Sequence, residues 1–206
     1  MTDIEGSNRP DRDDRDRRRL RDDLYRLLQA AIGDAGVKRR RVSVHDTGDG
    51  CMMLFRPEVP KARVLQAVAR DLPRRLHAHN RVVEPPLQLR LRVVVHAGEI
   101  DWDERGPLGG DLSDAFRLLD AAVVRERLAA TRAPMVLVVS QTIYHSVVQR
   151  GYGGIAAGSF SQVLVREKEF EESAWVHVPA APAPEEAGAA GRRRVRRWAV
   201  AVAAAG

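Results

Sequence analysis

The chain has 206 residues, of which 44% are hydrophobic and 30% charged, and this is the composition of an ordinary globular domain. A formal net charge of +6 favours an anionic partner, although much of the excess lies in two arginine-rich segments, 12–21 and 192–197. Aromatic residues make up only 5% and do not alternate with the basic runs, which argues against nucleic acid as that partner. The single cysteine, Cys51, excludes an intramolecular disulfide, and we expect a cytoplasmic protein.

The beginning of the chain predicts a helix followed by a β-hairpin. Apolar residues recur at helical spacing over residues 15–32. Two apolar runs, 42–44 and 51–55, flank turn-forming residues and predict the two strands of the hairpin. Asp49, in the sequence Gly-Asp-Gly, therefore lies at or near the hairpin tip.

The middle of the chain predicts a kinked helix, a long strand and a second long helix. Pro60 favours a helix start, and the helical spacing continues to about His79 with a kink expected at Pro73. Residues 87–100 alternate apolar with polar side chains, which predicts a long strand with one face exposed to water. A glycine-rich loop over 106–110 then precedes an amphipathic helix, expected over residues 111–131.

The remaining elements complete the expected sheet. Residues 135–139 predict a buried strand, and Ser140 is expected to cap a short helix that ends at Val148. Two more strands are expected over 161–165 and 174–178. The order βαββαβ, with further elements, argues for an α/β or α+β sandwich with helices on one face of the sheet. We expect the α+β class, with a ferredoxin-like arrangement of helices on a mostly antiparallel sheet.

We expect one domain over residues 1–178 and a separate linker and tail over 179–206. Residues 179–191 are rich in Ala, Pro, Glu and Gly, which is typical of a linker. The basic run before Trp198 is typical of the cytoplasmic flank of a membrane anchor that stops early. Two interpretations stay open, a disordered tail and weak contact of the tail with a membrane surface.

Two carboxylates at predicted strand ends, Asp3 and Asp49, are candidate metal ligands. If both point to one spot they can hold divalent cations against a nucleoside triphosphate, because Mg²⁺ is bound through one or two carboxylates plus phosphates. The alternatives are a frayed terminus and an ordinary turn. A strand that ends in a metal ligand needs about five residues before it. Since only Met1 and Thr2 precede Asp3, we expect a truncated first strand whose missing residues are encoded upstream.

Four short segments, taken in their order along the chain, form a recognisable pattern. They are Asp-Ile-Glu-Gly-Ser at 3–7, Gly-Asp at 48–49, Val-His-Ala-Gly-Glu at 95–99 and Gly-Gly-Asp-Leu-Ser-Asp-Ala-Phe-Arg-Leu at 109–118. Together they resemble the catalytic domain of class III nucleotide cyclases over roughly residues 1–178. The resemblance implies a head-to-tail homodimer with active sites at the interface. The implied reaction converts a nucleoside triphosphate to a 3′,5′-cyclic monophosphate and pyrophosphate.

The resemblance also implies roles for individual residues. Asp3 and Asp49 would bind two Mg²⁺ or Mn²⁺ ions, with the Ile4 carbonyl as a further ligand. Arg117 matches the arginine that stabilises charge at the α-phosphate. Lys168 aligns with the lysine that contacts the terminal phosphates, although a glutamate follows it here where the family usually has glycine.

The positions that select a purine base in the family hold other residues in this chain. His45 replaces a lysine, Gly106 replaces a polar residue, and Ser113 replaces the ribose-orienting asparagine. Unpaired polar edges of a purine would cost about 1 to 3 kcal/mol each, so ATP and GTP are not favoured. His96 matches a frequent family histidine, for which we expect the role of a hydrogen-bonded core residue.

Three functions therefore remain open. The first is a pyrimidine cyclase that makes cyclic UMP or cyclic CMP as an antiphage second messenger. The chain is similar to the compact bacterial enzymes of this kind, because they too keep the metal aspartates and lack the purine-reading residues. The second is an adenylate or guanylate cyclase with an altered base pocket, in which His45 or Arg105 substitutes. The third is a catalytically silent cyclase-like binding module or a basic nucleic-acid binder. A silent module would be expected to lose its metal ligands, and both are present.

Overall fold

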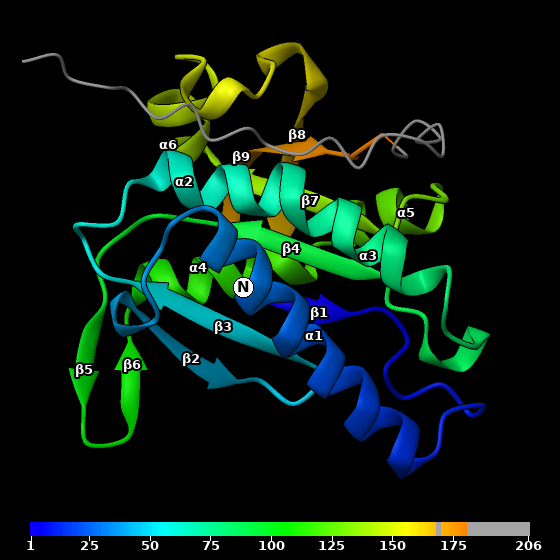
Figure 1. Ribbon diagram of the computed structural model, residues 1–206. Helices are drawn as coiled ribbons and strands as arrows, with labels where there is room; N and C mark the ends of the chain where they lie inside the picture. Colours follow the sequence, from blue (N-terminus) through cyan, green and yellow to red (C-terminus); the bar gives the residue numbers. More distant parts are fainter. Residues whose placement is uncertain (168–169, 181–206) are drawn as a thin grey trace, which may run out of the picture.

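A seven-stranded sheet forms the centre of the computed structural model, which describes residues 1–167 and 170–180 (Figure 1). Its strands, in spatial order, are β2 (Val42–Asp46), β3 (Gly50–Phe55), β1 (Thr2–Ile4), β4 (Leu91–Val95), β7 (Met135–Ser140), β9 (Phe170–His177) and β8 (Phe160–Glu167). Neighbouring strands are antiparallel except for β4 and β7, which are parallel. A separate hairpin consists of β5 (Asp101–Asp103) and β6 (Gly106–Leu108). The expected α+β class with a mostly antiparallel sheet is confirmed.

Helices cover both faces of this sheet, so the expectation that they lie on one face is wrong. The helices are α1 (Asp14–Asp34), α2 (Lys61–Gln66), α3 (Leu72–Asn80), α4 (Gly110–Asp120), α5 (Ala122–Ala129) and the short α6 (Gln141–Ile143). The first three pack with Ile4 and Leu91 in one hydrophobic cluster. Helices α4 and α5 pack with Val94 and Val136 in a second cluster on the opposite face. No helix within 1–167 or 170–180 is both long enough and apolar enough to cross a bilayer.

The first two predicted helices are confirmed with small changes. Helix α1 begins earlier than expected because Asp13 accepts a hydrogen bond from the backbone of Asp16, whose side chain accepts one in return. The kink expected at Pro73 is a π-helical turn, Ala67–Asp71, which joins α2 to α3. Pro73 then lies in the first turn of α3, where its missing N–H leaves no hydrogen bond unmade.

Four expectations for the middle of the chain are corrected. The long strand over 87–100 is limited to β4, which is buried on both faces because it lies in the centre of the sheet. The helix over 111–131 is divided at Ala121, whose ψ of 136° is extended. The glycine-rich loop contains β6. Ser140 lies just before α6, but its hydroxyl makes no capping hydrogen bond.

A cleft of about 570 Å³ lies where β1 begins, and residues of β3, of β4 and of α2 line it. Met1 continues the pairing of β1, since its ammonium donates to the Val94 carbonyl at 2.9 Å and its carbonyl accepts from the Val94 N–H at 2.9 Å. Burial lowers the pKa of the Met1 ammonium to about 6. The expected truncation of the first strand and the domain boundary at residue 178 stay predictions, and residues 181–206 of the tail lie outside the described residues.

Candidate active site

Asp3 lies in the middle of β1, and its side chain points to the sheet face opposite α1. Side chains alternate along a strand, and its neighbour Ile4 packs in the core beneath α1. Asp3 is paired with Gly50 on one side and with Arg92 on the other. A Cβ at Gly50 would lie 1.9 Å from the Thr2 carbonyl oxygen. This glycine therefore permits the close approach that brings the β2–β3 turn to Asp3.

The two predicted metal ligands, Asp3 and Asp49, meet at this turn. The Ile4 N–H donates to the Asp49 carbonyl oxygen at 3.0 Å, which fixes the turn to the end of β1. Burial raises the pKa of the Asp3 carboxyl to about 6, and Arg92 opposes this shift as hydrogen-bond donor and positive charge. Asp49 raises the Asp3 pKa further through its charge and as a hydrogen-bond partner. The pairing of Asp3 with Gly50 and the hydrogen bond from Ile4 to Asp49 together bring these two residues side by side.

The atoms gathered here fit a divalent metal ion that prefers oxygen. Two adjacent carboxylates repel each other, and a cation between them relieves that repulsion. The Ile4 carbonyl accepts a hydrogen bond from the Ser7 N–H at 3.3 Å and keeps a second lone pair. No cluster of three His, Cys, Asp or Glu side chains suited to a metal occurs in the described part of the chain. A metal bound here would thus need phosphate and water oxygens to complete its coordination.

Arg92 is a residue of this site that the sequence pattern assigned to a water-exposed strand face. Its Nε donates to Asp3 Oδ2 at 2.8 Å, and one terminal guanidinium nitrogen contacts the same oxygen. The other terminal nitrogen lies 3.7 Å from a carboxylate oxygen of Asp120, at the end of α4. Only 14% of the Arg92 side chain is exposed. Alternation of polar and apolar residues cannot distinguish such a buried ion pair from a solvated arginine.

The two candidate residues on α4 do not join Asp3 and Asp49 within one chain. The Ser113 hydroxyl donates to the Gly109 carbonyl at 3.2 Å. Arg117 donates to Asp114 at 2.8 Å, and its guanidinium lies 5.3 Å from the centre of the Phe170 ring. Both side chains are exposed on the helix. Lys168 lies outside the described residues.

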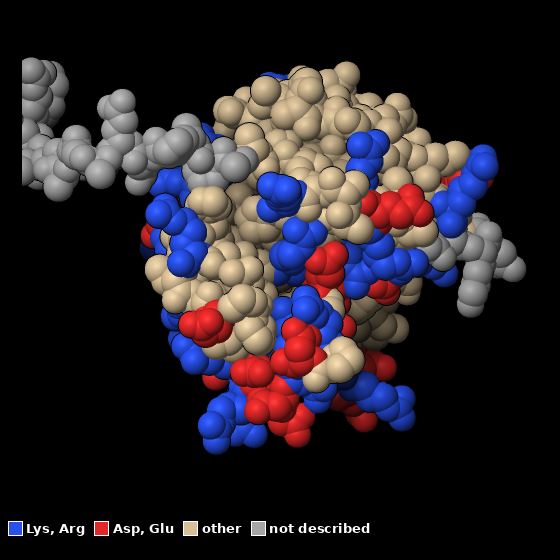
Figure 2. Space-filling model, turned by 90° about the vertical axis from the view of Figure 1, so that its right-hand side faces the viewer, with Lys and Arg blue, Asp and Glu red and all other residues tan. Residues whose placement is uncertain are grey.

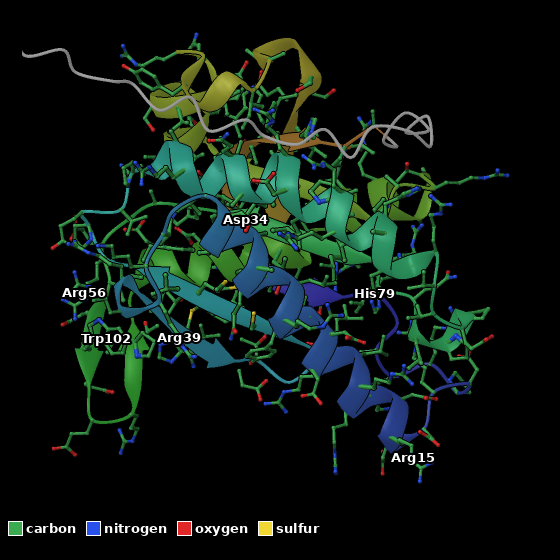
Figure 3. The ribbon with its side chains drawn as sticks, in the orientation of Figure 1. Arg15, Asp34, Arg39, Arg56, His79 and Trp102 are labelled. Carbon is green, nitrogen blue, oxygen red and sulfur yellow. The ribbon has the colours of Figure 1, made fainter. Side chains whose placement is uncertain are left out.

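The expected base-reading positions, His45 and Gly106, lie near the β5–β6 hairpin. His45 is the strand partner of Met52. It faces the same side of the sheet as Asp3, because the side chain of the next residue, Asp46, points to the other side and forms an ion pair with α1. The His45 ring lies 5.6 Å from the ring of Trp102, at 50° to it. Figure 3 shows Trp102 on this hairpin, which projects beyond the main sheet. Trp102 was not among the residues predicted from the sequence to form the site. The β5–β6 hairpin was not predicted, because its second strand was expected to be part of the glycine-rich loop over 106–110.

His96 follows β4, and its environment differs from the expected one. Neither ring nitrogen has a hydrogen-bond partner, although both are buried. The nearest charge is Asp111, whose carboxylate lies 3.6 Å from Nε2. The expectation of a hydrogen-bonded core histidine is therefore wrong.

The sheet order, the helices on both faces and the projecting hairpin together make an α+β fold that two solved cyclase structures share. An adenylate/guanylate cyclase/hydrolase from Silicibacter pomeroyi is 19% identical, with a TM-score of 0.60, over 87% of this chain and 94% of that one. The guanylyl cyclase Cya2 is 13% identical, with a TM-score of 0.54, over 85% of this chain and 86% of that one. The chain matches no family model and no curated protein. At these identities the likeness shows the shared fold alone.

Proposed function

We propose that this chain is a nucleotide cyclase that converts a nucleoside triphosphate to its 3′,5′-cyclic monophosphate and pyrophosphate. The observation that carries this proposal is the meeting of Asp3 and Asp49 where the β2–β3 turn is hydrogen-bonded to the end of β1. Their carboxylates and the Ile4 carbonyl would hold two Mg²⁺ or Mn²⁺ ions per active site. Ions bound there would lower the pKa of the ribose 3′-hydroxyl and neutralise the triphosphate.

In this proposal the active enzyme is a head-to-tail homodimer. Arg117 and Ser113 make no contact with Asp3 or Asp49 in the described part of one chain, so a second copy is needed to bring them together. Exposed apolar side chains support such an interface, and they belong to the hairpin, to α4 and to β2: Trp102, Leu108, Phe116 and Val44. Arg117 would then stabilise charge at the α-phosphate, Ser113 would orient the ribose, and Lys168 would contact the terminal phosphates.

We further propose that the base is a pyrimidine, with UTP converted to cyclic UMP as an antiphage second messenger. His45 packs against Trp102, and Gly106 offers no side chain. A pocket with these residues lacks the paired polar groups that a purine edge requires. The alternative is an adenylate or guanylate cyclase in which Arg105, exposed at the β5–β6 turn, supplies the missing contact.

A catalytically silent module is the second candidate, because Arg92 contacts the Asp3 carboxylate that a metal would need. Nucleic-acid binding is less favoured. On the face shown in Figure 2, basic side chains are interspersed with acidic ones. Ion pairs along α1, such as Arg17 with Asp14 and Arg26 with Asp23, also neutralise charge locally.

The experiment is to incubate the purified protein with each of the four nucleoside triphosphates and Mn²⁺, and to identify cyclic products by mass spectrometry. A cyclic pyrimidine nucleotide is the expected product. Asp49→Ala should abolish its formation, whereas the matched control Glu58→Ala, at an exposed ion pair with Arg41, should not. Absence of product from all four substrates would favour the silent module.

A further inference from the structure

Arg92 is placed to compete with a metal ion for Asp3. The two residues are direct neighbours across β1 and β4, and 8% of the Asp3 side chain is exposed. Two guanidinium nitrogens contact one carboxylate oxygen, Oδ2. A charge-assisted contact with two donors is among the stronger polar interactions in proteins, and burial reduces its screening by water.

Charge counting shows what this contact does to the site. Asp3 and Asp49 supply two carboxylates, and the guanidinium of Arg92 offsets the charge of one of them. Metal affinity of oxygen sites rises with the number of charged ligands. A free divalent cation therefore meets a site in which one carboxylate is already neutralised, whereas a cation bound to a triphosphate is also held by the phosphate oxygens and needs less from that site.

Asp120 gives the guanidinium a second partner. It lies at the end of α4, its nearest oxygen is 3.7 Å from Arg92, and 63% of its side chain is exposed. A cation that takes the Asp3 carboxylate can thus displace the guanidinium towards Asp120, so that Arg92 is not left buried without a counter-charge.

We propose that Arg92 is a positioning residue that makes the carboxylate pair select the metal–triphosphate complex over the free metal ion. This inference rests on the proposed function, since it assumes that Asp3 and Asp49 form the metal site. Arg92 acts through Asp3 and does not touch the substrate. Asp120 sets how readily Arg92 releases Asp3.

The test is the affinity of the protein for Mn²⁺ alone, measured by isothermal titration calorimetry without nucleotide. Arg92→Gln removes the charge and keeps a hydrogen-bond donor, so it should bind free Mn²⁺ at least tenfold more tightly than the unchanged protein. Arg92→Lys keeps the charge and should stay within about threefold of it. Asp120→Asn removes the second partner and should weaken binding. Circular dichroism checks that each variant is folded.

Each outcome separates the proposal from a structural role. If Arg92→Gln weakens or does not change Mn²⁺ binding, or if Arg92→Lys behaves like Arg92→Gln, the charge argument is wrong. Should Arg92→Gln not fold, Asp120→Asn still decides, because unchanged Mn²⁺ affinity in that variant would show that Asp120 does not help Arg92 to release Asp3. If neither the unchanged protein nor any variant binds Mn²⁺, the inference is overturned. Failure of the proposed function is recognised separately, as absence of cyclic product in a protein that does bind Mn²⁺.

Discussion

Gly50 lies so close to Thr2 that a side chain cannot fit between them. The ideal Cβ position at Gly50 is 1.9 Å from the Thr2 carbonyl oxygen and 2.8 Å from its carbonyl carbon. Both neighbours are backbone atoms, which cannot rotate away. The spacing between β1 and β3, and with it the approach of Asp49 to Asp3, therefore depends on this glycine.

Gly50→Ala is expected to lower the free energy of unfolding by about 1 to 3 kcal/mol, because the backbone of β1 must move. Urea unfolding followed by circular dichroism measures the change. The matched control is Gly33→Ala in α1, where no atom lies within 4 Å of the added carbon. That substitution is expected to raise stability by about 0.5 to 1 kcal/mol, because alanine is the better helix former. Equal effects at the two positions would contradict the close contact.

The pH dependence of stability should report the buried Asp3 carboxyl. Its pKa is raised from 3.8 to about 6, first because it is buried. Between these values the folded protein holds a proton on Asp3 that the unfolded chain has released, so the free energy of unfolding should fall as the pH rises through about 6. This contribution is complete below the unfolded pKa and lost above the folded one.

Unfolding in urea at a series of pH values from 4 to 7, in metal-free buffer, measures this slope. Asp3→Asn cannot titrate, and its profile should lack the decline that Asp3 contributes. A surface variant, Asp22→Asn, controls for the general effect of removing a carboxylate. Parallel profiles for the unchanged protein and Asp3→Asn would show that Asp3 does not titrate in this range.

A head-to-tail dimer predicts complementation between two inactive variants. Asp49→Ala removes the metal site of one chain, and Arg117→Ala removes the arginine that the same chain lends to its partner. In a mixed dimer one active site carries both defects and the other is intact. An equal mixture should recover about a quarter of the unchanged activity, because half of the dimers are mixed and each has one working site. Each variant alone gives the baseline, and recovery no higher than that baseline would place all catalytic groups in one chain.

Local sequence signals predicted the elements whose cause is local. Helix α1 and the β2–β3 hairpin follow from apolar spacing and turn residues within a few positions, and the closeness of Asp49 to the turn follows with them. The limits of β4 could not be predicted from such local signals, because they depend on which strands and helices lie beside it. Arg92 was missed for the same reason, since its partner Asp3 is 89 positions away in the sequence. The break at Ala121 has no glycine or proline to mark it.

Arg12 is the clearest case of a residue whose role its sequence neighbourhood conceals. It begins a basic run, yet only 5% of it is exposed. Its guanidinium donates to the carbonyls of Gly6, Pro86 and Gln88 at 2.8, 2.9 and 3.0 Å. These bonds join the loop after β1 to the segment before β4, on either side of the Asp3 site.

Arg12→Lys should therefore destabilise the fold, because an ammonium cannot reach three carbonyls that a guanidinium fork reaches together. The expected loss in the free energy of unfolding is about 2 to 4 kcal/mol, since hydrogen bonds to charged groups contribute about 1.5 to 3 kcal/mol each and lysine keeps some of them. Arg9→Lys is the matched control, because Arg9 forms an exposed ion pair with Asp11 and should lose less than about 0.5 kcal/mol. Urea unfolding at one pH compares the two. If Arg12→Lys is no less stable than Arg9→Lys, the carbonyl contacts do not hold the loop, and Asp3 must be positioned by β3 and β4 alone.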